Sequence, residues 1–329
     1  MEAQVVSKFG DSSVFETVKL TKPNVKAGYV IINVLATSIN PIDYKMRNGN
    51  YPDITADFPA VLHSDVAGVI EEVGEGVTDF KKGDEVYGCA GGFKGEDGAL
   101  SEFMLADAKL IALKPNSLTM REAAALPLVS ITAWEALYDK IDLKKKQNIL
   151  IHGATGGVGH IAVQLAKCKG VKVYATISSD EKAKIAKSLG VDEVINYRVE
   201  SVQEYVDRLT EGKGFDVVFD TVGGANIDAS MQAVAFYGDV VTILSQSSHD
   251  LSPLFFKSAN LHVVFMLLPL LYNIQRKRHG EILQKIAKLV DDGAVKPLID
   301  DNKFTFDAVG DAHKLLESGK ALGKVVVSR

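Results

Sequence analysis

The chain has 329 residues, of which 47% are hydrophobic and 24% are charged, and its formal net charge is −5 at pH 7. This is the composition of a globular protein, and the length allows about two domains of ~150 residues each. The mildly acidic balance does not favour a nucleic-acid or membrane-surface partner. Two cysteines, Cys89 and Cys168, are too few for a disulfide framework or a four-cysteine zinc site.

Localisation is predicted from what the sequence lacks. The opening residues show no basic cluster followed by an apolar core, as a signal peptide would. The most apolar run, Val263–Tyr272, is about half as long as the ~20 residues that a spanning helix needs. Because a low cysteine content suits a reducing compartment, we expect a cytoplasmic protein with no stable membrane insertion.

The first ~120 residues alternate short β-branched runs, such as "YVIINVLATS" and "GVIEEVG", with turns rich in Gly, Pro and Asp. They predict a β-rich domain. Near Thr119 the pattern changes to "SLTMREAAALPL", which predicts a helix with Ser117 as its N-cap.

From Asn148 onward, strand patterns rich in Val and Ile alternate with helix patterns. Such alternation predicts a parallel sheet covered on both faces, which is a doubly wound Rossmann domain over residues 122–265. The tail contains one strong helix, "RHGEILQKIAKLVDDG", and two strand-like runs, "KPLID" and "GKVVVSR". Because so few elements make a poor core, we expect residues 266–329 to rejoin the first domain, residues 1–121.

The strongest motif is "ILIHGATGGVGHIAVQLAK", a strand that leads through a glycine-rich turn into a helix. Ala154, Gly156 and Gly159 occupy the three small-residue positions of the G-x-G-x-x-G fingerprint. These positions allow a tight turn, close approach of the backbone to a pyrophosphate, and close packing of the helix on the strand. The helix N-terminus then offers free N–H groups to the phosphates. We expect a dinucleotide cofactor to bind along residues 154–159, which are Ala154, Thr155, Gly156, Gly157, Val158 and Gly159.

The choice between NAD and NADP depends on the end of the second strand, "VYATISSDEK". An NAD site would place a carboxylate at the strand tip, where this chain has Ile177 and Ser178. Ser178, Lys182 and Tyr197 could instead contact a 2′-phosphate or the adenine. We therefore favour NADPH, while Asp180 and Glu181 keep an NAD site possible.

These motifs, together with "NPIDYKMRNG", "FPAVLHSDVAGVIEEVG", "KKGDEVYG", "GALSEFM" and "AAALPLVSITAWEAL", resemble those of the medium-chain dehydrogenase/reductases over essentially the whole chain. The resemblance is to the zinc-free quinone oxidoreductase branch, which includes zeta-crystallin. It implies an α/β fold, with a GroES-like catalytic domain beside the Rossmann domain. It also implies NADPH-dependent hydride transfer to quinones or α,β-unsaturated carbonyls by a homodimer.

Zinc can be tested position by position against that resemblance. The three catalytic zinc ligands of zinc alcohol dehydrogenases fall on Asn40, Ser64 and Leu128 in our alignment, none of which is a Cys, His or carboxylate. The segment that matches the four-cysteine structural zinc lobe keeps only Cys89. We expect no metal. Hydride addition to a quinone or an enone needs less Lewis-acid help than carbonyl reduction, because the acceptor delocalises the developing charge.

The remaining candidates come from the resemblance and from the rule that ligands gather at the carboxyl ends of parallel strands. Asn40, Tyr44 and Tyr51 are the catalytic candidates, although the two tyrosines fit ordinary half-buried aromatics equally well; we take Asp43 to be structural. The resemblance places Thr132 and Lys324 near the cofactor, and the strand-end rule adds Val222, Leu244 and Ser245. Phe265, Met266 and Leu267 are expected to line an apolar acceptor pocket.

Two other functions stay open on the sequence. One is a zinc-type alcohol dehydrogenase with displaced ligands. The other is a non-catalytic protein that binds NADPH, because an intact fingerprint serves both an enzyme and a binding protein.

Overall fold

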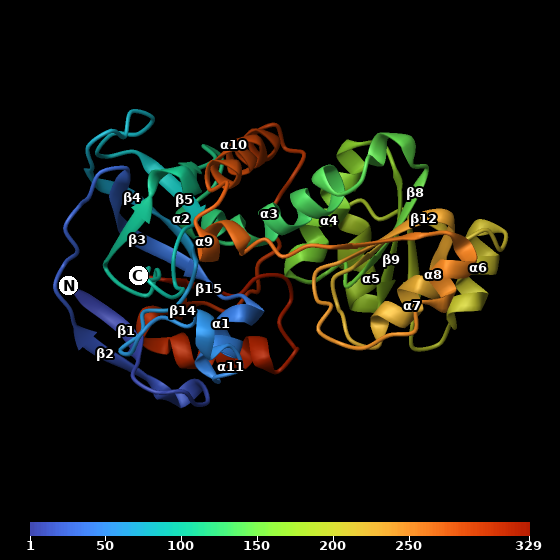
Figure 1. The fold of residues 1–329 in the computed structure, drawn as a ribbon, viewed down its shortest axis with the longest axis horizontal. Helices are drawn as coiled ribbons and strands as arrows, with labels where there is room; N and C mark the ends of the chain where they lie inside the picture. The colour runs from blue at the N-terminus through green and yellow to red at the C-terminus, as the bar shows by residue number, and fades with distance from the viewer. The chain divides into compact units, whose positions relative to one another are not determined.

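The computed structural model describes residues 1–329, and the chain divides into two compact units. The first unit comprises Met1–Ile131 and Leu267–Arg329, and the second comprises Thr132–Met266. Figure 1 shows the first unit in blue, cyan and red and the second in green to orange. No helix combines the length and the apolar character that crossing a membrane requires.

Nine strands build the first unit, as the sequence predicts for a β-rich domain. β1 (Glu2–Val6) and β2 (Phe15–Lys19) form an antiparallel pair. The main sheet has the order β14-β15-β3-β4-β5-β7, and β6 also pairs with β3. Its strands are β3 (Tyr29–Ser38), β4 (Asp65–Val73), β5 (Glu85–Cys89), β6 (Phe103–Asp107), β7 (Ile111–Leu113), β14 (Phe304–Thr305) and β15 (Val326–Ser328).

The helices of this unit come from both of its chain segments. They are α1 (Pro41–Arg47), α2 (Met120–Ala124), α9 (Leu268–Tyr272), α10 (Lys277–Asp291) and α11 (Val309–Glu317), while α3 (Pro127–Trp134) crosses into the second unit. α10 packs on β7, and α11 packs on α1. Short 3₁₀ turns of this unit cover Ser12–Val14, Pro52–Ile54, Ala108–Leu110 and Phe306–Ala308. In the second unit, a π-helical turn covers Glu135–Asp139 and a 3₁₀ turn covers Leu143–Lys145.

The helix expected near Thr119 is present, but its cap differs from the prediction. Thr119, not Ser117, is the N-cap of α2; its hydroxyl accepts from the Glu122 N–H while the Glu122 carboxylate accepts from the Thr119 N–H. This capping box satisfies two N–H groups that the helix leaves without partners. α2 packs on β3 and β4, so the first unit extends to Ile131, ten residues beyond the predicted end at residue 121.

The C-terminal tail returns to the first unit. Its last strand, β15, pairs antiparallel with β3, with Val327 opposite Thr37. The run "KPLID" forms no strand, contrary to the prediction; it contributes one isolated bridge from Ile299 to Lys324. This bridge anchors the segment that carries Lys324.

The second unit contains one parallel sheet of six strands, in the order β10-β9-β8-β11-β12-β13. The strands are β8 (Asn148–His152), β9 (Lys172–Ile177), β10 (Glu193–Asn196), β11 (Phe215–Asp220), β12 (Val234–Thr242) and β13 (Asn260–Val263). Numbered from β8, this is the 3-2-1-4-5-6 order of a dinucleotide-binding sheet, whose direction of winding changes between β8 and β11. The predicted doubly wound fold is confirmed.

Five helices alternate with these strands: α4 (Gly157–Cys168), α5 (Asp180–Ser188), α6 (Val202–Thr210), α7 (Asn226–Ala233) and α8 (Ser252–Lys257). α4 packs on β8 and β9, whereas α7 packs on β11 and β12. The core under α6 and α7 is mainly aliphatic and also contains three aromatic side chains, Tyr174, Tyr205 and Phe215. The rings of Tyr174 and Phe215 meet edge to face at 5.1 Å.

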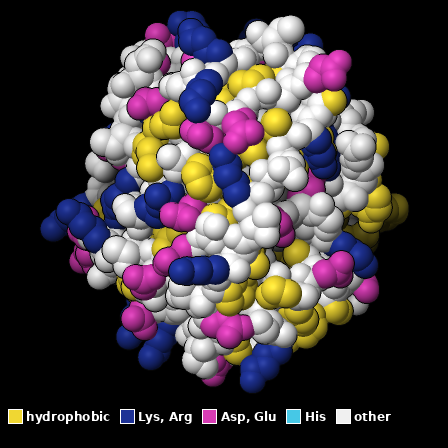
Figure 2. Space-filling model, turned by 90° about the vertical axis from the view of Figure 1, so that its left-hand side faces the viewer, with side chains coloured by type: hydrophobic (Ala, Val, Ile, Leu, Met, Phe, Trp, Pro, Cys, Tyr) yellow, Lys and Arg dark blue, Asp and Glu magenta, His cyan; other side chains and the backbone are white.

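The surface of the first unit carries charges of both signs. On the face shown in Figure 2, Lys and Arg side chains are interspersed with Asp and Glu, and small apolar areas lie between them. That face therefore offers no broad patch of a single sign.

Candidate active site

The fingerprint loop joins β8 to α4 in the second unit. Gly153 turns the chain with φ of +74°, and Gly156 is the N-cap of α4. A Cβ on Gly159 would lie 2.1 Å from the Gly153 carbonyl oxygen, so only glycine permits this packing of helix on strand. The N–H groups of the first turn, residues 157–159, have no partners inside the helix and point to where a phosphate would bind.

Two of the three candidates for recognising the adenosine end directly follow neighbouring strands. Ser178 follows β9, and Tyr197 follows β10, with the Tyr197 N–H donating to the Ile177 carbonyl at 3.3 Å. The Tyr197 side chain is 56% exposed and so is accessible to a ligand. Lys182 lies in the first turn of α5, where its N–H is capped by the Ser179 hydroxyl. The structure therefore brings Ser178 and Tyr197 together at one edge of the sheet, with Lys182 one helical turn further on.

A second loop at the carboxyl ends of the parallel strands follows β11, and Asp220 organises it. The sequence analysis did not identify Asp220. The buried Oδ1 of Asp220 accepts from the Val222 N–H at 2.8 Å, the Gly223 N–H at 2.9 Å and the Asn226 amide at 3.0 Å. These bonds fix the turn and leave Val222 half exposed. A Cβ on Gly223 would lie 2.6 Å from the Leu244 carbonyl oxygen, so Leu244, which follows β12, lies against this turn. The other predicted residue, Ser245, is the next residue of the chain.

Beneath these loops runs a row of buried polar side chains: Thr176, His152, Asp220 and Thr242 are register neighbours across four adjacent strands. His152 Nδ1 lies 3.1 Å from Thr176 Oγ1, and the Thr221 hydroxyl donates to the His152 carbonyl at 2.7 Å. Burial lowers the pKa of His152 to about 4, although Asp220 opposes the shift, so the imidazole is neutral. The row ties together the strand ends from which the cofactor loops start.

In the first unit, Asn40 lies in contact with two residues that are distant in sequence, Asp65 and Lys324. The Asn40 Nδ2 donates to Asp65 Oδ2 at 2.8 Å, and its Oδ1 accepts from the Lys324 ammonium. Lys324 also donates to the Ile39 carbonyl at 3.0 Å and lies 3.3 Å from Asp65 Oδ2. All three residues are at most 2% exposed. Because a cation lies at one end of the amide and a carboxylate at the other, the orientation of the amide is fixed.

Asp65 is the centre of this cluster. Besides Asn40 and Lys324, its carboxylate accepts from the Ser38 hydroxyl at 2.7 Å and from the Leu128 N–H at 2.8 Å. A buried carboxylate needs partners of this kind, because burial removes it from water, and the cluster supplies one cation and three hydrogen-bond donors. The resemblance assigns Lys324 to the cofactor, whereas the structure bonds its ammonium to Ile39, Asn40 and Asp65.

The other catalytic candidates lie on or beside α1, whose N-cap is Asn40. Asp43 Oδ2 accepts from the Asn40 N–H at 2.6 Å. Burial raises the pKa of Asp43 to about 7, against the lowering effect of that N–H bond. Tyr44 is half-buried on the next position of α1, and Tyr51 is half-buried at the start of a 3₁₀ turn.

The side chains at the three positions where zinc alcohol dehydrogenases carry their ligands do not fit a catalytic zinc. Both polar atoms of the Asn40 amide are engaged by Asp65 and Lys324, Ser64 is fully buried, and Leu128 contributes only its backbone N–H. A buried ammonium in the same cluster would repel a metal cation. No group of three His, Cys, Asp or Glu side chains is arranged to hold a metal ion.

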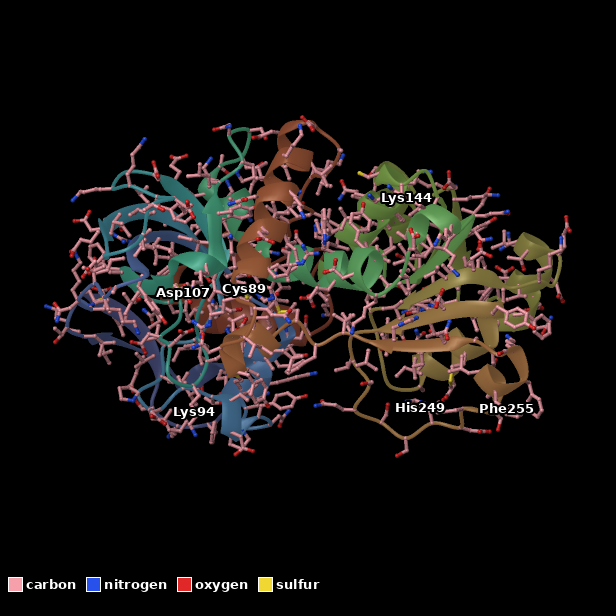
Figure 3. All side chains as sticks on the ribbon, turned by 45° about the horizontal axis from the view of Figure 1, so that its top comes forward. Cys89, Lys94, Asp107, Lys144, His249 and Phe255 are labelled. Atoms are coloured by element: carbon pink, nitrogen blue, oxygen red, sulfur yellow. The ribbon has the colours of Figure 1, made fainter.

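The remaining candidates differ in how far they are exposed. Thr132 is buried on α3, Met266 and Leu267 are each 5% exposed, and Phe265 is 47% exposed. Cys89 lies inside the first unit (Figure 3), and burial raises the pKa of its thiol well above the usual value. It is therefore an unreactive thiol at neutral pH.

Comparison with known proteins agrees with this architecture. Residues 26–116 match the alcohol dehydrogenase GroES-like domain, and residues 189–327 match the zinc-binding dehydrogenase family. A 2-methylene-furan-3-one reductase of Solanum lycopersicum is 36% identical, over 93% of this chain and 73% of its own length. An NADPH-dependent alkenal/one oxidoreductase, chloroplastic, of Arabidopsis thaliana is 33% identical, over 99% of this chain and 79% of its own length.

Among solved structures, Escherichia coli quinone oxidoreductase complexed with NADPH superposes with a TM-score of 0.88 at 28% identity, covering the whole of both chains. A two-unit fold of this kind, with a fingerprint loop in one unit and a GroES-like sheet in the other, defines a nucleotide-dependent dehydrogenase or reductase. The chain belongs to the medium-chain dehydrogenase/reductase superfamily, in its zeta-crystallin-like branch.

Proposed function

We propose that this protein is an NADPH-dependent oxidoreductase that transfers hydride to quinones or α,β-unsaturated carbonyls without zinc. The observation that carries the proposal is the Asn40–Asp65–Lys324 cluster, which replaces a set of metal ligands by a fixed amide. The printed names of the relatives, a furanone reductase, an alkenal/one oxidoreductase and a quinone oxidoreductase, support this class of acceptor.

NADPH, when bound, supplies the hydride. The fingerprint loop would hold the pyrophosphate, with Gly156 and Gly159 allowing close approach. Ser178, Lys182 and Tyr197 would contact the adenosine 2′-phosphate. Asn40 keeps one Nδ2 hydrogen beyond the one given to Asp65, and that hydrogen could bind the acceptor oxygen as charge develops on it.

The direct test is turnover of purified protein with NADPH against a panel of small quinones, enones and 2-alkenals, together with metal analysis. We expect NADPH oxidation, product reduced at the C=C bond or to the quinol, and less than stoichiometric zinc. Stoichiometric zinc, with activity lost to a chelator, would instead support a zinc alcohol dehydrogenase. NADPH binding without turnover on any acceptor would support a non-catalytic protein.

The role of Asn40 can be separated from general damage with a matched variant. Asn40→Ala should lower kcat by about 10- to 100-fold and leave the Kd for NADPH within about twofold, because the fingerprint loop is in the other unit. Asn50→Ala, at an exposed position shortly after α1, should change neither value. Equal kcat values for the two variants would remove Asn40 from the proposed site.

We further propose a homodimer formed through β13, the edge strand of the parallel sheet. Leu261 and Val263 on this strand are 37% and 45% exposed, and an exposed apolar edge is a surface that proteins usually cover.

A cytoplasmic location is also proposed, because both cysteines are free thiols. Since the Arabidopsis relative is named as chloroplastic, cell fractionation is the measurement that decides the location.

A further inference from the structure

A line of buried hydrogen bonds crosses the first unit beside the Asn40 cluster. It begins at Arg47 on α1, passes through His313 on α11 and His63 in the segment before β4, and reaches Thr37 on β3. Arg47 Nη1 lies 2.9 Å from His313 Nδ1, and His313 Nε2 lies 2.8 Å from His63 Nε2. His63 Nδ1 lies 3.3 Å from Thr37 Oγ1, and the Thr37 hydroxyl donates to the Asp65 carbonyl at 2.6 Å.

The guanidinium end fixes the position of every proton in the line. A guanidinium can only donate, so Arg47 requires an acceptor at His313 Nδ1. The proton of a neutral His313 is then on Nε2 and is donated to His63 Nε2. His63 must therefore carry its proton on Nδ1 and donate it to the Thr37 oxygen.

The hydroxyl end leads independently to the same assignment. A carbonyl oxygen only accepts, so the single hydroxyl proton of Thr37 goes to Asp65. Thr37 then has only lone pairs to offer His63, and His63 must donate from Nδ1. Since both ends agree, the line has one direction, from Arg47 to Asp65.

Protonation of either imidazole would break the line. A second proton on His63 would lie on Nε2, facing the proton that His313 donates, and a second proton on His313 would lie on Nδ1, facing the Arg47 donor. Burial lowers the pKa of His63 to about 3, and burial likewise lowers the pKa of His313. Both rings are fully buried and nearly parallel, with planes 19° and centroids 5.1 Å apart, as an in-plane bond between the two Nε2 atoms requires. The rings are therefore neutral at the pH of the cell.

The backbone also shows that His63 is held in place. Its φ is +71°, in the left-handed region, which costs a non-glycine residue on the order of 1–2 kcal/mol. The Ala99 N–H donates to the His63 carbonyl at 2.8 Å. Such a conformation persists only where the surrounding contacts determine it.

The two ends of the line differ in their surroundings. At the outer end, Glu317 binds the Arg47 guanidinium with both oxygens, at 2.7 and 2.9 Å. At the inner end lies Asp65, whose side chain orients the Asn40 amide. The line thus joins the ion pair of buried Arg47 and partly exposed Glu317 to the residue at the centre of the candidate site.

We infer that His313 is a positioning residue, which acts through His63 and Thr37 to hold Asp65 and thereby the amide of Asn40. This inference rests on the proposed function in one respect only, namely that Asn40 contacts the acceptor. The direction of the line and the orientation of the amide can be measured whether or not the protein turns over a substrate.

The test compares His313→Phe, which keeps a flat ring but removes both nitrogens, with His313→Gln, whose amide can donate to His63. Nitrogen-15 NMR of the full-length protein should show neutral His63 protonated on Nδ1 in the wild type. The Asn40 side-chain amide signals, assigned with Asn40→Ala, should shift in His313→Phe and remain close to wild type in His313→Gln. With NADPH and an acceptor from the panel, His313→Phe should lose about tenfold or more in kcat while KM for NADPH stays within about twofold.

If His313→Phe does not fold, Thr37→Val breaks the last link of the same line and carries the same expectations. Unchanged Asn40 amide signals in the folded variant, or a His63 proton on Nε2 in the wild type, would overturn the inference. A wild-type protein that turns over no acceptor, but whose Asn40 signals shift in His313→Phe, would refute the proposed function and retain the positioning role.

Discussion

At the residue scale, Asp43 gives the clearest prediction of how the free energy of unfolding depends on pH. Burial raises its pKa from 3.8 to about 7, so the folded state keeps a proton between pH 4 and 7 that the unfolded state has lost. Raising the pH through this window therefore favours unfolding. We expect this group alone to cost on the order of 3 kcal/mol in the free energy of unfolding between pH 5 and pH 8.

Asp43→Asn removes this titration and keeps an oxygen that can accept from the Asn40 N–H. The variant should lose less stability than the wild type between pH 5 and pH 8 in urea unfolding experiments, since all other groups titrate alike in both proteins. A parallel pH dependence for the two proteins would mean that Asp43 is ionised in the folded state throughout.

Lys182, also considered at the residue scale, is expected to determine the preference for NADPH over NADH. Lys182→Ala should raise KM for NADPH by about tenfold, which corresponds to about 1.4 kcal/mol, and leave KM for NADH unchanged, because only NADPH has the 2′-phosphate. Lys184→Ala, an exposed lysine on the same helix, serves as the control. Equal increases with both cofactors would assign Lys182 a structural role.

Single residues of the candidate site can be predicted from the sequence more readily than the contacts between them. Asn40 follows from the resemblance, and Gly159 follows from the fingerprint itself. The bonds among Asn40, Asp65 and Lys324 join positions up to 284 residues apart, and no local pattern encodes such a meeting. Asp220 could have been found, since an Asp at the end of a strand and directly before a glycine-containing turn is a common anchor of backbone N–H groups.

At the scale of elements, the packing of α4 on β8 depends on the absence of a side chain at Gly159. Gly159→Ala would place a methyl group 2.1 Å from the Gly153 carbonyl oxygen and 2.8 Å from the Ala154 Cα. The loop must shift to relieve these contacts, so we expect a loss of about 1–3 kcal/mol in stability and about tenfold or more in NADPH affinity. Thermal unfolding and a fluorescence titration with NADPH measure the two effects.

Gly170→Ala is the matched control for that variant. Gly170 follows the same helix with φ of +74°, and no atom lies within 4 Å of a Cβ built there. Backbone strain alone should cost about 1 kcal/mol and leave NADPH affinity unchanged. A loss of affinity in this control equal to that in Gly159→Ala would show that general destabilisation, not the loop, weakens binding.

Elements were predictable where periodicity is strong. Strands β8 to β12 and helices α4 to α6 follow from alternating runs of apolar and amphipathic sequence and are present, whereas the same pattern did not predict α7, α8 or β13. Ser117 was wrong as a cap because Thr119 has Glu122 three residues on, which completes a capping box that Ser117 cannot form. The run "KPLID" resembles a strand in composition, but β15 alone pairs with β3.

At the scale of the whole molecule, the return of the tail was predictable from the small size of its core. The unit boundary was harder to place, because α2 looks like the first helix of a helical domain and yet packs on the sheet of the first unit. Which unit a short helix joins depends on which apolar surface it covers, and the helix's own sequence does not show that surface.

The proposed dimer also belongs to this scale, and its test is a change of charge on β13. Leu261→Lys combined with Val263→Lys would place two ammonium groups along the exposed edge, where charged side chains oppose strand pairing. Analytical ultracentrifugation should show a dimer for the wild type and a monomer for the double variant. The NADPH affinity should change little, because the fingerprint loop follows β8, in the middle of the sheet.

Val199→Lys is the control. It adds an ammonium group at a position that is 80% exposed beyond the opposite edge strand, and it should leave the dimer intact. A wild-type monomer, or a double variant that still dimerises, would contradict an interface formed through this strand.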